Sequence, residues 1–205
     1  MEIQNYLHNV WQGKRKWSEQ QFVDCNTVSS SCKGGYTYKL VSDWLIPDAV
    51  HPVLLSDYPY VSGVTQTAGT CNTKAVFDSQ EEAYIATLSP MLTAVDAPLK
   101  KIGALAVGPT VTHVRADTYL WQFYQQGILN DSCCWGVGTR NPLNHAVNTV
   151  GWGTEIIDGD EHAYWLVRNS WGTNWAAGDL QPEHLKGYIK LKIASFGPGI
   201  CGEQI

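Results

Sequence analysis

The sequence predicts an α+β protein of two lobes, a helical first lobe over residues 1–86 and a β-rich second lobe over residues 87–205. Apolar side chains recur at helical spacing in the first half of the chain. Apolar runs and alternating segments, which are typical of strands, occupy the second half. With 205 residues, 44% of them hydrophobic and 16% charged, the chain can bury a substantial core.

Composition and charge exclude several classes of protein. No apolar run approaches the roughly 18–20 residues that a membrane-spanning helix needs. The formal net charge is −5, from 14 basic and 19 acidic residues, which leaves no basic face on the scale that nucleic-acid binding requires. The low charged fraction also argues against a disordered chain. We therefore expect a folded protein that binds neither membranes nor nucleic acids.

The first helix is predicted by an apolar stripe at the start of the chain. The stripe has the i, i+3, i+4, i+7 pattern of a helix with one buried face: Ile3, Tyr6, Leu7, Val10 and Trp11. No Ser, Thr, Asp or Asn capping residue precedes it, so the chain is expected to begin inside a helix. The first residues also lack the basic start and apolar core of a signal peptide.

Two further helices are expected in the first lobe. The segment Ser18-Glu19-Gln20-Gln21 has the form of a capping box, which predicts a short helix that runs to Cys25. An apolar stripe over residues 40–45 predicts another helix, which Pro47 ends. Residues 46–78, rich in Pro and Gly, are expected to form long loops.

The second lobe is expected to begin with a short helix and to continue with strands. The segment Asp96-Ala97-Pro98 is a helix start, and the apolar residues after it predict a helix to Leu105. Four segments have the apolar runs or the alternation of strands: 110–115, 146–150, 163–167 and 188–193. In the last of them, one face carries Ile189, Leu191 and Ile193, and the other carries Lys190 and Lys192.

The cysteines favour an oxidising compartment. The chain has six cysteines but no CxxC pair, and the tandem Cys133-Cys134 is a poor two-ligand metal knuckle, so disulfides are favoured over metal ligation. The sequon Asn130-Asp131-Ser132 fits a secreted or lumenal chain. No metal and no other cofactor is expected.

Three segments carry the residues from which a function can be predicted. The first is Ser18-Glu19-Gln20-Gln21-Phe22-Val23-Asp24-Cys25, followed by Cys32-Lys33-Gly34-Gly35. The second is Asn144-His145-Ala146-Val147, which continues to Val150-Gly151-Trp152-Gly153. The third is Tyr164-Trp165-Leu166-Val167-Arg168-Asn169-Ser170-Trp171-Gly172, with Gly187-Tyr188 beyond it.

In the order, spacing and flanking residues of these segments, the chain resembles the papain-like cysteine peptidases over about residues 2–204. The resemblance implies a papain-like two-lobe fold with a helical N-terminal lobe and an antiparallel β-barrel-like C-terminal lobe. It also implies an endopeptidase domain that hydrolyses peptide bonds through a thiolate, a histidine and an asparagine.

The resemblance assigns the catalytic positions to His145 and Asn169, and a supporting position to Trp171. A thiolate forms readily beside an imidazolium, which stabilises its negative charge. An amide can orient the imidazole without competing for its proton. Trp171 is expected to cover that hydrogen bond and keep water from it. Taken alone, each of these residues would be read as a core or turn residue.

The resemblance also implies a set of substrate-binding residues. The backbone of Gly34 and Gly35 is expected to approach an extended peptide and pair with it like a strand. The pocket for the second substrate residue is expected to be lined by Tyr36, Thr37, His113, Asn144 and Ala146. His113 stands where the family has an apolar wall, so it should make that pocket more polar.

Two elements of the family's catalytic apparatus have no match. The nucleophile of the family lies in a Cys-Gly-Ser-Cys-Trp segment, and a glutamine before that segment completes the oxyanion hole. The chain is expected to start after the nucleophile, inside the same central helix, and therefore to be inactive as it stands. Cys25 matches a structural cysteine of the family and cannot replace the nucleophile.

The resemblance predicts two disulfides. It pairs Cys25 with Cys71, and Cys201 with either Cys133 or Cys134. Cys32 would pair with a cysteine that this sequence does not contain. Cys32 and one of the tandem pair are therefore expected to be free thiols.

Several positions depart from the family pattern. Ser31 and Ala176 stand where glycines are usual. An extra segment, Asp179–Lys186, precedes Gly187-Tyr188. The long interval between His145 and Asn169 predicts a hairpin insertion at Glu155–His162.

The main hypothesis is a cysteine-type endopeptidase domain, with peptide or protein substrates and possible protein inhibitors as partners. A peptidase homologue that binds peptides without cleaving them, and a non-functional fragment, are the alternatives. By family resemblance the protein is expected to be monomeric and to be lysosomal or extracellular.

Overall fold

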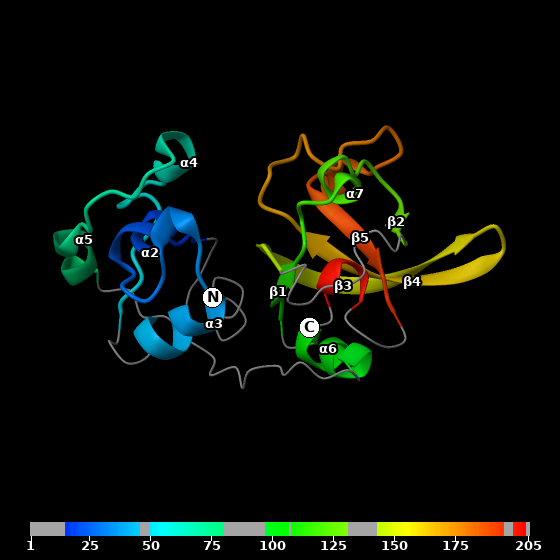
Figure 1. The fold of residues 1–205 in the computed structure, drawn as a ribbon, viewed down its shortest axis with the longest axis horizontal. Coiled ribbons are helices and arrows are strands. Elements are labelled where there is room, and N and C mark those ends of the chain that lie inside the picture. The colour runs from blue at the N-terminus through cyan, green and yellow to red at the C-terminus, as the bar shows by residue number, and fades with distance from the viewer. Residues whose placement is uncertain are drawn as a thin grey trace. The chain divides into compact units, whose positions relative to one another are not determined.

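The computed structural model describes residues 15–45, 50–79, 97–106, 108–130, 143–194 and 199–203 (Figure 1). The chain divides into two compact units, Met1–Pro90 and Met91–Ile205. The helix predicted over residues 2–12 and the helix-ending Pro47 lie outside the described residues. In the described parts of the chain, no helix is long and apolar enough to cross a membrane.

The first unit consists of short helices and loops. Helix α2 (Glu19–Cys25) ends at the residue predicted for it, and helix α3 (Thr37–Lys39) continues into a π-helical segment (Leu40–Leu45) where the apolar stripe predicted a helix. The prediction of loops throughout residues 46–78 is wrong at α4 (Ser62–Thr65) and α5 (Thr73–Asp78). Both helices are too short to show an apolar periodicity in the sequence.

Ser18 caps α2 as predicted, but Gln21 does not complete the capping box. Ser18 Oγ accepts a hydrogen bond from the backbone N–H of Gln21 at 3.0 Å. The Gln21 side chain instead reaches the loop after Pro47: its Nε2 donates to the carbonyl of His51 at 2.8 Å, and its Oε1 accepts from the N–H of Val53 at 2.9 Å. This glutamine therefore fixes a loop rather than the helix start.

Gln20 is the polar centre of the first unit, and its side chain is fully buried. Its Oε1 accepts from the backbone N–H groups of Val61 and Ser62 at 2.8 and 2.9 Å. Its Nε2 donates to Ser62 Oγ at 2.7 Å and to Asp24 Oδ1 at 2.8 Å. Asp24 in turn accepts from the Tyr58 hydroxyl at 2.7 Å. Because both ends of the amide are paired, its burial leaves no polar atom unsatisfied.

The predicted disulfide between Cys25 and Cys71 is confirmed. The Cα atoms of the two residues lie 4.7 Å apart, within the range that a disulfide spans. Cys32 is a free, exposed cysteine. Cys201 is also disulfide-bonded. Its predicted partners, Cys133 and Cys134, lie outside the described residues, so the identity of that partner stays a prediction.

The second unit is built on a five-stranded sheet with the strand order β1-β3-β4-β5-β2. The strands are β1 (Thr110–Val114), β2 (Ile128–Leu129), β3 (His145–Ile157), β4 (Asp160–Arg168) and β5 (Tyr188–Lys192). The neighbouring strands are antiparallel, except that β2 pairs with β5 in parallel. The long strands thus pair as the antiparallel lobe that was predicted, and the two-residue β2 adds one parallel pair. The described part of the unit also contains the α-helices α6 (Ala97–Leu105), as predicted, and α7 (Tyr119–Gln122), and 3₁₀ helices at Glu183–Leu185 and Ile200–Gly202.

One hydrophobic core holds the second unit together. It lies between the sheet, α6 and α7, and its fully buried side chains include Val114, Trp121, Trp165, Val167, Ile189 and Leu191. Burial of such side chains contributes about 1.5–3 kcal/mol each. The packed core therefore fixes the positions of the strand ends and of the side chains at those ends.

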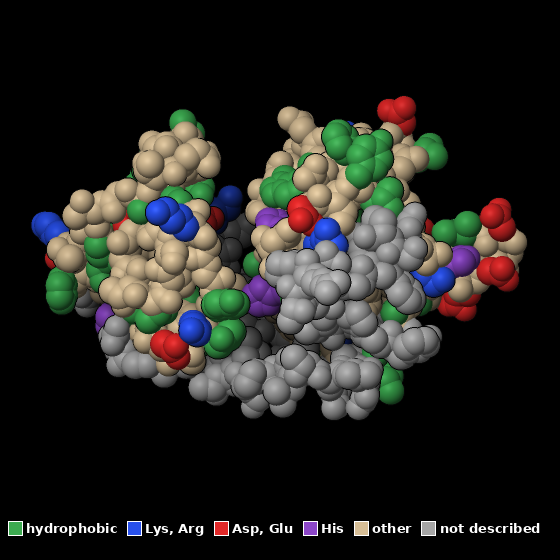
Figure 2. All heavy atoms as spheres, in the orientation of Figure 1, with side chains coloured by type: hydrophobic (Ala, Val, Ile, Leu, Met, Phe, Trp, Pro, Cys, Tyr) green, Lys and Arg blue, Asp and Glu red, His purple; other side chains and the backbone are tan. Residues whose placement is uncertain are grey.

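The predicted insertion at residues 155–162 is the free end of the β3–β4 hairpin, which turns at Asp158 and Gly159. Asp158 and Gly159 both have positive φ angles, 54° and 92°. Acidic side chains gather at this end of the hairpin, seen at the right of Figure 2, and the exposed ones are Asp158, Asp160 and Glu161. Like charges at an exposed hairpin end oppose edge-to-edge pairing with other chains.

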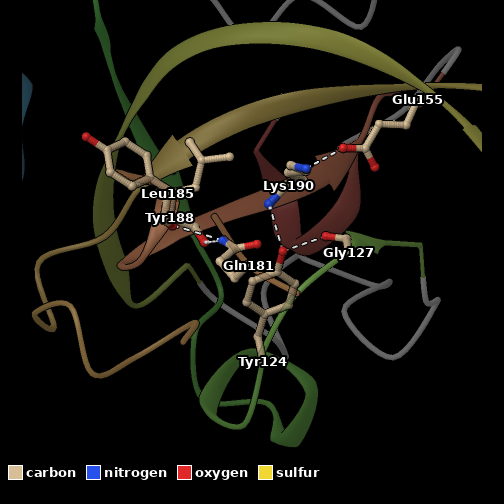
Figure 3. A network of polar contacts seen from close by, with 7 residues as sticks. All are labelled: Tyr124, Gly127, Glu155, Gln181, Leu185, Tyr188 and Lys190. Atoms are coloured by element: carbon tan, nitrogen blue, oxygen red, sulfur yellow. Dashed lines mark hydrogen bonds and ion pairs between the residues drawn. The ribbon is translucent and has the colours of Figure 1, made fainter. Parts of the chain in front are cut away.

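Lys190 lies on the face of β5 opposite the buried Ile189 and Leu191, as the alternation predicts, but that face is covered as well. Lys190 is 8% exposed and forms an ion pair with Glu155 of β3 (Figure 3). Its ammonium also lies 5.1 Å from the ring centroid of Tyr164. Both faces of β5 are thus covered, because the long β3–β4 hairpin supplies a carboxylate and an aromatic ring above the lysine.

Lys101 and Glu203 form a buried polar pair beneath Trp165. Lys101 Nζ donates to the backbone carbonyl of Glu203 at 2.7 Å, and it lies 4.7 Å from the Trp165 ring centroid. Burial lowers the pKa of Lys101 to about 8 and raises the pKa of Glu203 to about 8. The pair thus joins α6, which carries Lys101, to the backbone at residue 203.

The Gln20 network predicts a large loss of stability in Gln20→Ala. The substitution removes the acceptor of the buried Ser62 N–H and of the partly buried Val61 N–H, which should lower the free energy of unfolding of the first unit by about 2–4 kcal/mol. Urea unfolding followed by tryptophan fluorescence measures this. Glu19→Ala, on the exposed side of the same helix, is the matched control and should change stability by less than about 0.5 kcal/mol. Equal effects of the two substitutions would contradict the account of the network.

The buried Glu203 predicts a stability that falls as the pH rises. Because the pKa of this carboxyl is raised from 4.5 to about 8 in the folded chain, its contribution is complete below about pH 4.5 and is lost as the pH rises toward 8. Glu203→Gln keeps the shape and does not titrate. Between about pH 5 and pH 8, the free energy of unfolding of the second unit should fall in both proteins. The fall should be smaller in the variant, by at least about 1 kcal/mol. Parallel pH profiles in urea unfolding would show that the carboxyl is not buried as described.

Candidate active site

His145 and Asn169 meet at one end of the β3–β4 pair. His145 is the first residue of β3, and Asn169 directly follows the last residue of β4. Because the two strands are antiparallel neighbours, these positions lie at the same edge of the sheet. His145 Nε2 lies 2.8 Å from Asn169 Oδ1, within hydrogen-bond distance. The geometry brings together two residues that stand far apart in the sequence.

A second hydrogen bond fixes the roles of the atoms in this pair. Asn169 Oδ1 also accepts from the backbone N–H of Ser170 at 2.8 Å, which identifies this atom as the amide oxygen. An oxygen that only accepts requires a donor opposite it, so the proton of the neutral imidazole is on His145 Nε2. The other ring nitrogen, Nδ1, then keeps its lone pair and can accept a proton.

Asn169 is held rigidly from the backbone side. Its N–H donates to the carbonyl of Gly187 at 3.0 Å, which extends the β4–β5 ladder by one residue. The Asn169 side chain is 8% exposed. Its Nδ2 is buried and has no hydrogen-bond partner among the described residues. The backbone bond and the burial of the residue therefore hold Asn169 in place beside the histidine.

Trp171 lies against His145 and connects it to the core. The centroids of the two rings are 5.3 Å apart. On its other side Trp171 meets Trp175 edge-on at 5.6 Å. Trp175 stacks on the fully buried Trp121 at 5.8 Å, and its Nε1 donates to the Trp121 carbonyl at 3.1 Å. Trp171 remains 42% exposed, so it is a partly solvent-accessible neighbour of His145.

The three predicted pocket residues of the second unit lie on or beside β1 and β3. His113 is the cross-strand neighbour of Ala146. His113 is half-buried, and its burial lowers the pKa of its ring. Asn144 has a structural task, because its Oδ1 accepts from the backbone N–H of Ala116 at 2.8 Å and so holds the turn after β1.

The other predicted binding residues lie in the first unit. Gly34 has a φ of 100°, and both its N–H and its carbonyl are bonded within its own turn. At Gly35 a Cβ atom would lie 2.5 Å from the Ser29 side chain, so only glycine fits there. Tyr36 is 61% exposed, and its ring packs on Tyr38 at 5.7 Å. Thr37 is the first residue of α3.

Two supporting contacts were not predicted from the sequence. The contacts are the Gly187 carbonyl that accepts from Asn169 and the Trp175 ring next to Trp171. No pattern in the sequence around Gly187 or Trp175 indicates them. The only sequence signal nearby is the extra segment Asp179–Lys186, which links Trp175 to Gly187. Among the described residues, no three His, Cys, Asp or Glu side chains gather in a way that could hold a metal ion.

Comparison with known proteins gives one consistent result. The family model described as "Papain family cysteine protease" matches residues 1–198. The cysteine protease Amb a 11.0101 of Ambrosia artemisiifolia is 31% identical over 192 residues, which cover 91% of this chain and 41% of that protein. Fruit bromelain of Ananas comosus is 31% identical over 186 residues, which cover 90% of this chain and 44% of that protein. The chain thus spans less than half the length of these curated relatives.

Solved structures show the same similarity. The bromelain protease from Ananas comosus, determined in complex with the E64 inhibitor, has a TM-score of 0.71 and 30% identity, covering 100% of this chain and 80% of that one. The proform of the ragweed pollen allergen Amb a 11 has a TM-score of 0.71 and 26% identity, covering 99% of this chain and 53% of that one. The papain-like fold predicted from the sequence motifs is confirmed by these similarities.

The contact between Trp171 and His145 predicts a measurable shielding of the ring proton. In Trp171→Ala, exchange of the His145 Nε2 proton with water should become at least about tenfold faster, because one side of the hydrogen bond loses its cover. The exchange is measured by NMR on the ¹⁵N-labelled chain. Trp152→Ala is the control, since Trp152 is 45% exposed on β3 and is cross-strand to Trp165 rather than beside His145. An unchanged exchange rate in Trp171→Ala would exclude a shielding role.

Proposed function

The chain belongs to the papain family of cysteine proteases, and we propose that its second unit supplies the histidine and the orienting asparagine for hydrolysis of peptide bonds by a cysteine thiolate. The observation that carries the proposal is the hydrogen bond of 2.8 Å between His145 Nε2 and Asn169 Oδ1. That bond leaves Nδ1 of the ring as the atom that exchanges a proton with the thiol.

In the proposed reaction His145 acts first as a base and then as an acid. Nδ1 takes the thiol proton, and the resulting imidazolium stabilises the thiolate. The thiolate sulfur attacks the carbonyl carbon of the substrate. His145 then gives its proton to the departing amine as the C–N bond breaks. Water, deprotonated by His145, hydrolyses the acyl-enzyme and returns the cysteine to its thiol form.

Asn169 and Trp171 support these steps without exchanging protons. Asn169 Oδ1 holds the Nε2 proton, so the ring keeps its orientation in both protonation states. Trp171 limits access of water to that hydrogen bond. In proteases with a catalytic triad, loss of the orienting residue lowers kcat by as much as about 10⁴-fold.

We propose that the chain is inactive by itself. Cys25 and Cys201 are disulfide-bonded and offer no thiol. Cys32 is a free thiol, but it lies on a 3₁₀ turn (Ser31–Lys33) of the first unit and does not match the family's nucleophile position. The sequence contains no Cys-Gly-Ser-Cys-Trp segment. The oxyanion glutamine of the family likewise has no match.

Substrate binding is proposed for the matching positions of both units. Gly35 can pair its backbone with an extended peptide, whereas the polar groups of Gly34 are bonded within the turn. Tyr36, Thr37, His113, Asn144 and Ala146 are proposed to surround the second residue of the substrate. Peptides or proteins are the proposed substrates, protein inhibitors are proposed partners, and a lysosomal or extracellular location is proposed for the monomeric protein.

The proposal predicts no turnover by the chain of 205 residues. A fluorogenic dipeptide substrate at about pH 5 with a reducing agent should give only the background rate, because loss of a covalent nucleophile costs several orders of magnitude in rate. His145→Ala is the control for any signal. Turnover that disappears in His145→Ala would contradict the proposed inactivity and would show that another group serves as nucleophile.

The proposed protease activity is tested with the nucleotide sequence upstream of the Met1 codon. A reading frame upstream of the Met1 codon that encodes a Cys-Gly-Ser-Cys-Trp-like segment supports the protease, and its product should lose roughly 10²–10⁴-fold in kcat/KM in His145→Ala. A genuine promoter and a translation start at Met1 would favour the alternatives: the non-catalytic homologue if the chain binds peptides without cleaving them, and the non-functional fragment if it does not fold.

A further inference from the structure

The extra segment Asp179–Lys186 connects the two elements that support the histidine–asparagine pair. Before it stands Trp175, whose ring packs edge-on against Trp171. After it stands Gly187, whose carbonyl accepts the N–H of Asn169 at 3.0 Å. The two ends of the segment therefore adjoin the contacts that support Trp171 and Asn169.

Gly187 is the point at which the contacts converge. Its N–H donates to the Trp175 carbonyl at 2.9 Å. Its φ is 84°, and a Cβ atom there would lie 3.1 Å from the carbonyl oxygen of Gly172. The backbone of Gly187 thus touches the residues after Trp171 as well as Asn169. It has no side chain of its own with which to hold this position.

Gln181 holds the backbone on both sides of Gly187. Its side chain is 6% exposed, and its Nε2 donates to the carbonyl of Leu185 at 2.9 Å and to that of Tyr188 at 3.2 Å (Figure 3). The amide therefore uses both of its N–H donors on carbonyls that flank Gly187 in the sequence. Its backbone N–H also donates to the carbonyl of Gly178, the residue just before the segment, at 2.9 Å.

We propose that Gln181 is a positioning residue for the His145–Asn169 pair. By fixing Leu185 and Tyr188, it sets the place of the Gly187 carbonyl, which sets the backbone of Asn169 and so the distance from Oδ1 to His145 Nε2. The effect of Gln181 on the position of Asn169 follows from these contacts alone. The effect of that position on catalysis rests on the proposed function.

A second glutamine near the segment provides the matched control. Gln126 Oε1 accepts from the backbone N–H of Leu180 at 2.8 Å. It anchors the beginning of the same segment but makes no contact, among those described, with the residues that flank Gly187. Its removal should loosen the segment without moving Asn169.

The experiment compares Gln181→Ala, Gln181→Met and Gln126→Ala by NMR of the ¹⁵N-labelled chain. Gln181→Met keeps most of the side-chain volume and removes the donors. In both Gln181 variants, exchange of the His145 Nε2 proton and of the Asn169 amide proton should become at least about tenfold faster. Gln126→Ala should leave both rates within about twofold of the wild type. Methyl signals of the buried Val114 and Val167 report whether the sheet is folded.

Three results would overturn the proposal. Wild-type exchange rates in both Gln181 variants would show that the amide does not position the pair. Equal acceleration in Gln126→Ala would show a general effect of the segment. Loss of the methyl signals in both Gln181 variants would make Gln181 a folding residue rather than a positioning one. None of these readings needs turnover, so they stand whether or not the proposed protease activity is found.

Discussion

The hydrogen bond between His145 and Asn169 depends on the register of two antiparallel strands. The β3–β4 pairing places Asn148 opposite Arg168, so the start of β3 and the residue after β4 fall at one edge of the sheet. A shift of one residue would turn every side chain of a strand to the opposite face. The buried Val147, Thr149 and Val167 oppose such a shift, because it would expose them. Burial of ordinary core residues thus fixes the geometry of the polar pair.

Side-chain amides of glutamine hold the loops of both units. Gln20 and Gln21 bind backbone groups of residues 51–62 in the first unit, and Gln181 binds backbone groups on both sides of Gly187 in the second. An amide offers an acceptor and two donors without charge, so it can satisfy a loop's backbone groups in the interior at a small desolvation cost. Long irregular segments can therefore remain fixed in this fold.

Local patterns predicted the regular elements better than the contacts between them. The Ser18 cap, the helix to Leu105 and the strand segments follow from spacing and alternation, which act over a few residues. Lys190 shows the limit of this reasoning. Its alternation with Ile189 and Leu191 placed it on the opposite face of the strand, where Glu155, 35 positions away, forms an ion pair with it. No periodicity within β5 could show a partner on another strand.

The candidate site was predictable only where its residues form motifs. His145 and Asn169 were identified by resemblance, since an isolated histidine beside apolar residues carries no sign of its role. Ser31 and Ala176, which replace glycines of the family pattern, both have positive φ angles, 52° and 54°. The backbone there keeps a conformation that favours glycine, although the sequence no longer signals it. The contacts of Gln181 with the residues that flank Gly187 arise from the segment Asp179–Lys186, which is extra relative to the family pattern.

The most direct test of this account is the tautomer of His145. The hydrogen bond from Ser170 to Asn169 Oδ1 requires the imidazole proton to be on Nε2. Nitrogen-15 shifts and long-range ¹H–¹⁵N correlations of the neutral ring distinguish the two tautomers. The account predicts a protonated Nε2 and an unprotonated Nδ1 in the wild type, and a mixture of the two forms in Asn169→Ala. A wild-type ring protonated at Nδ1 would contradict it, because the atom assigned to exchange a proton with the thiol would already carry one.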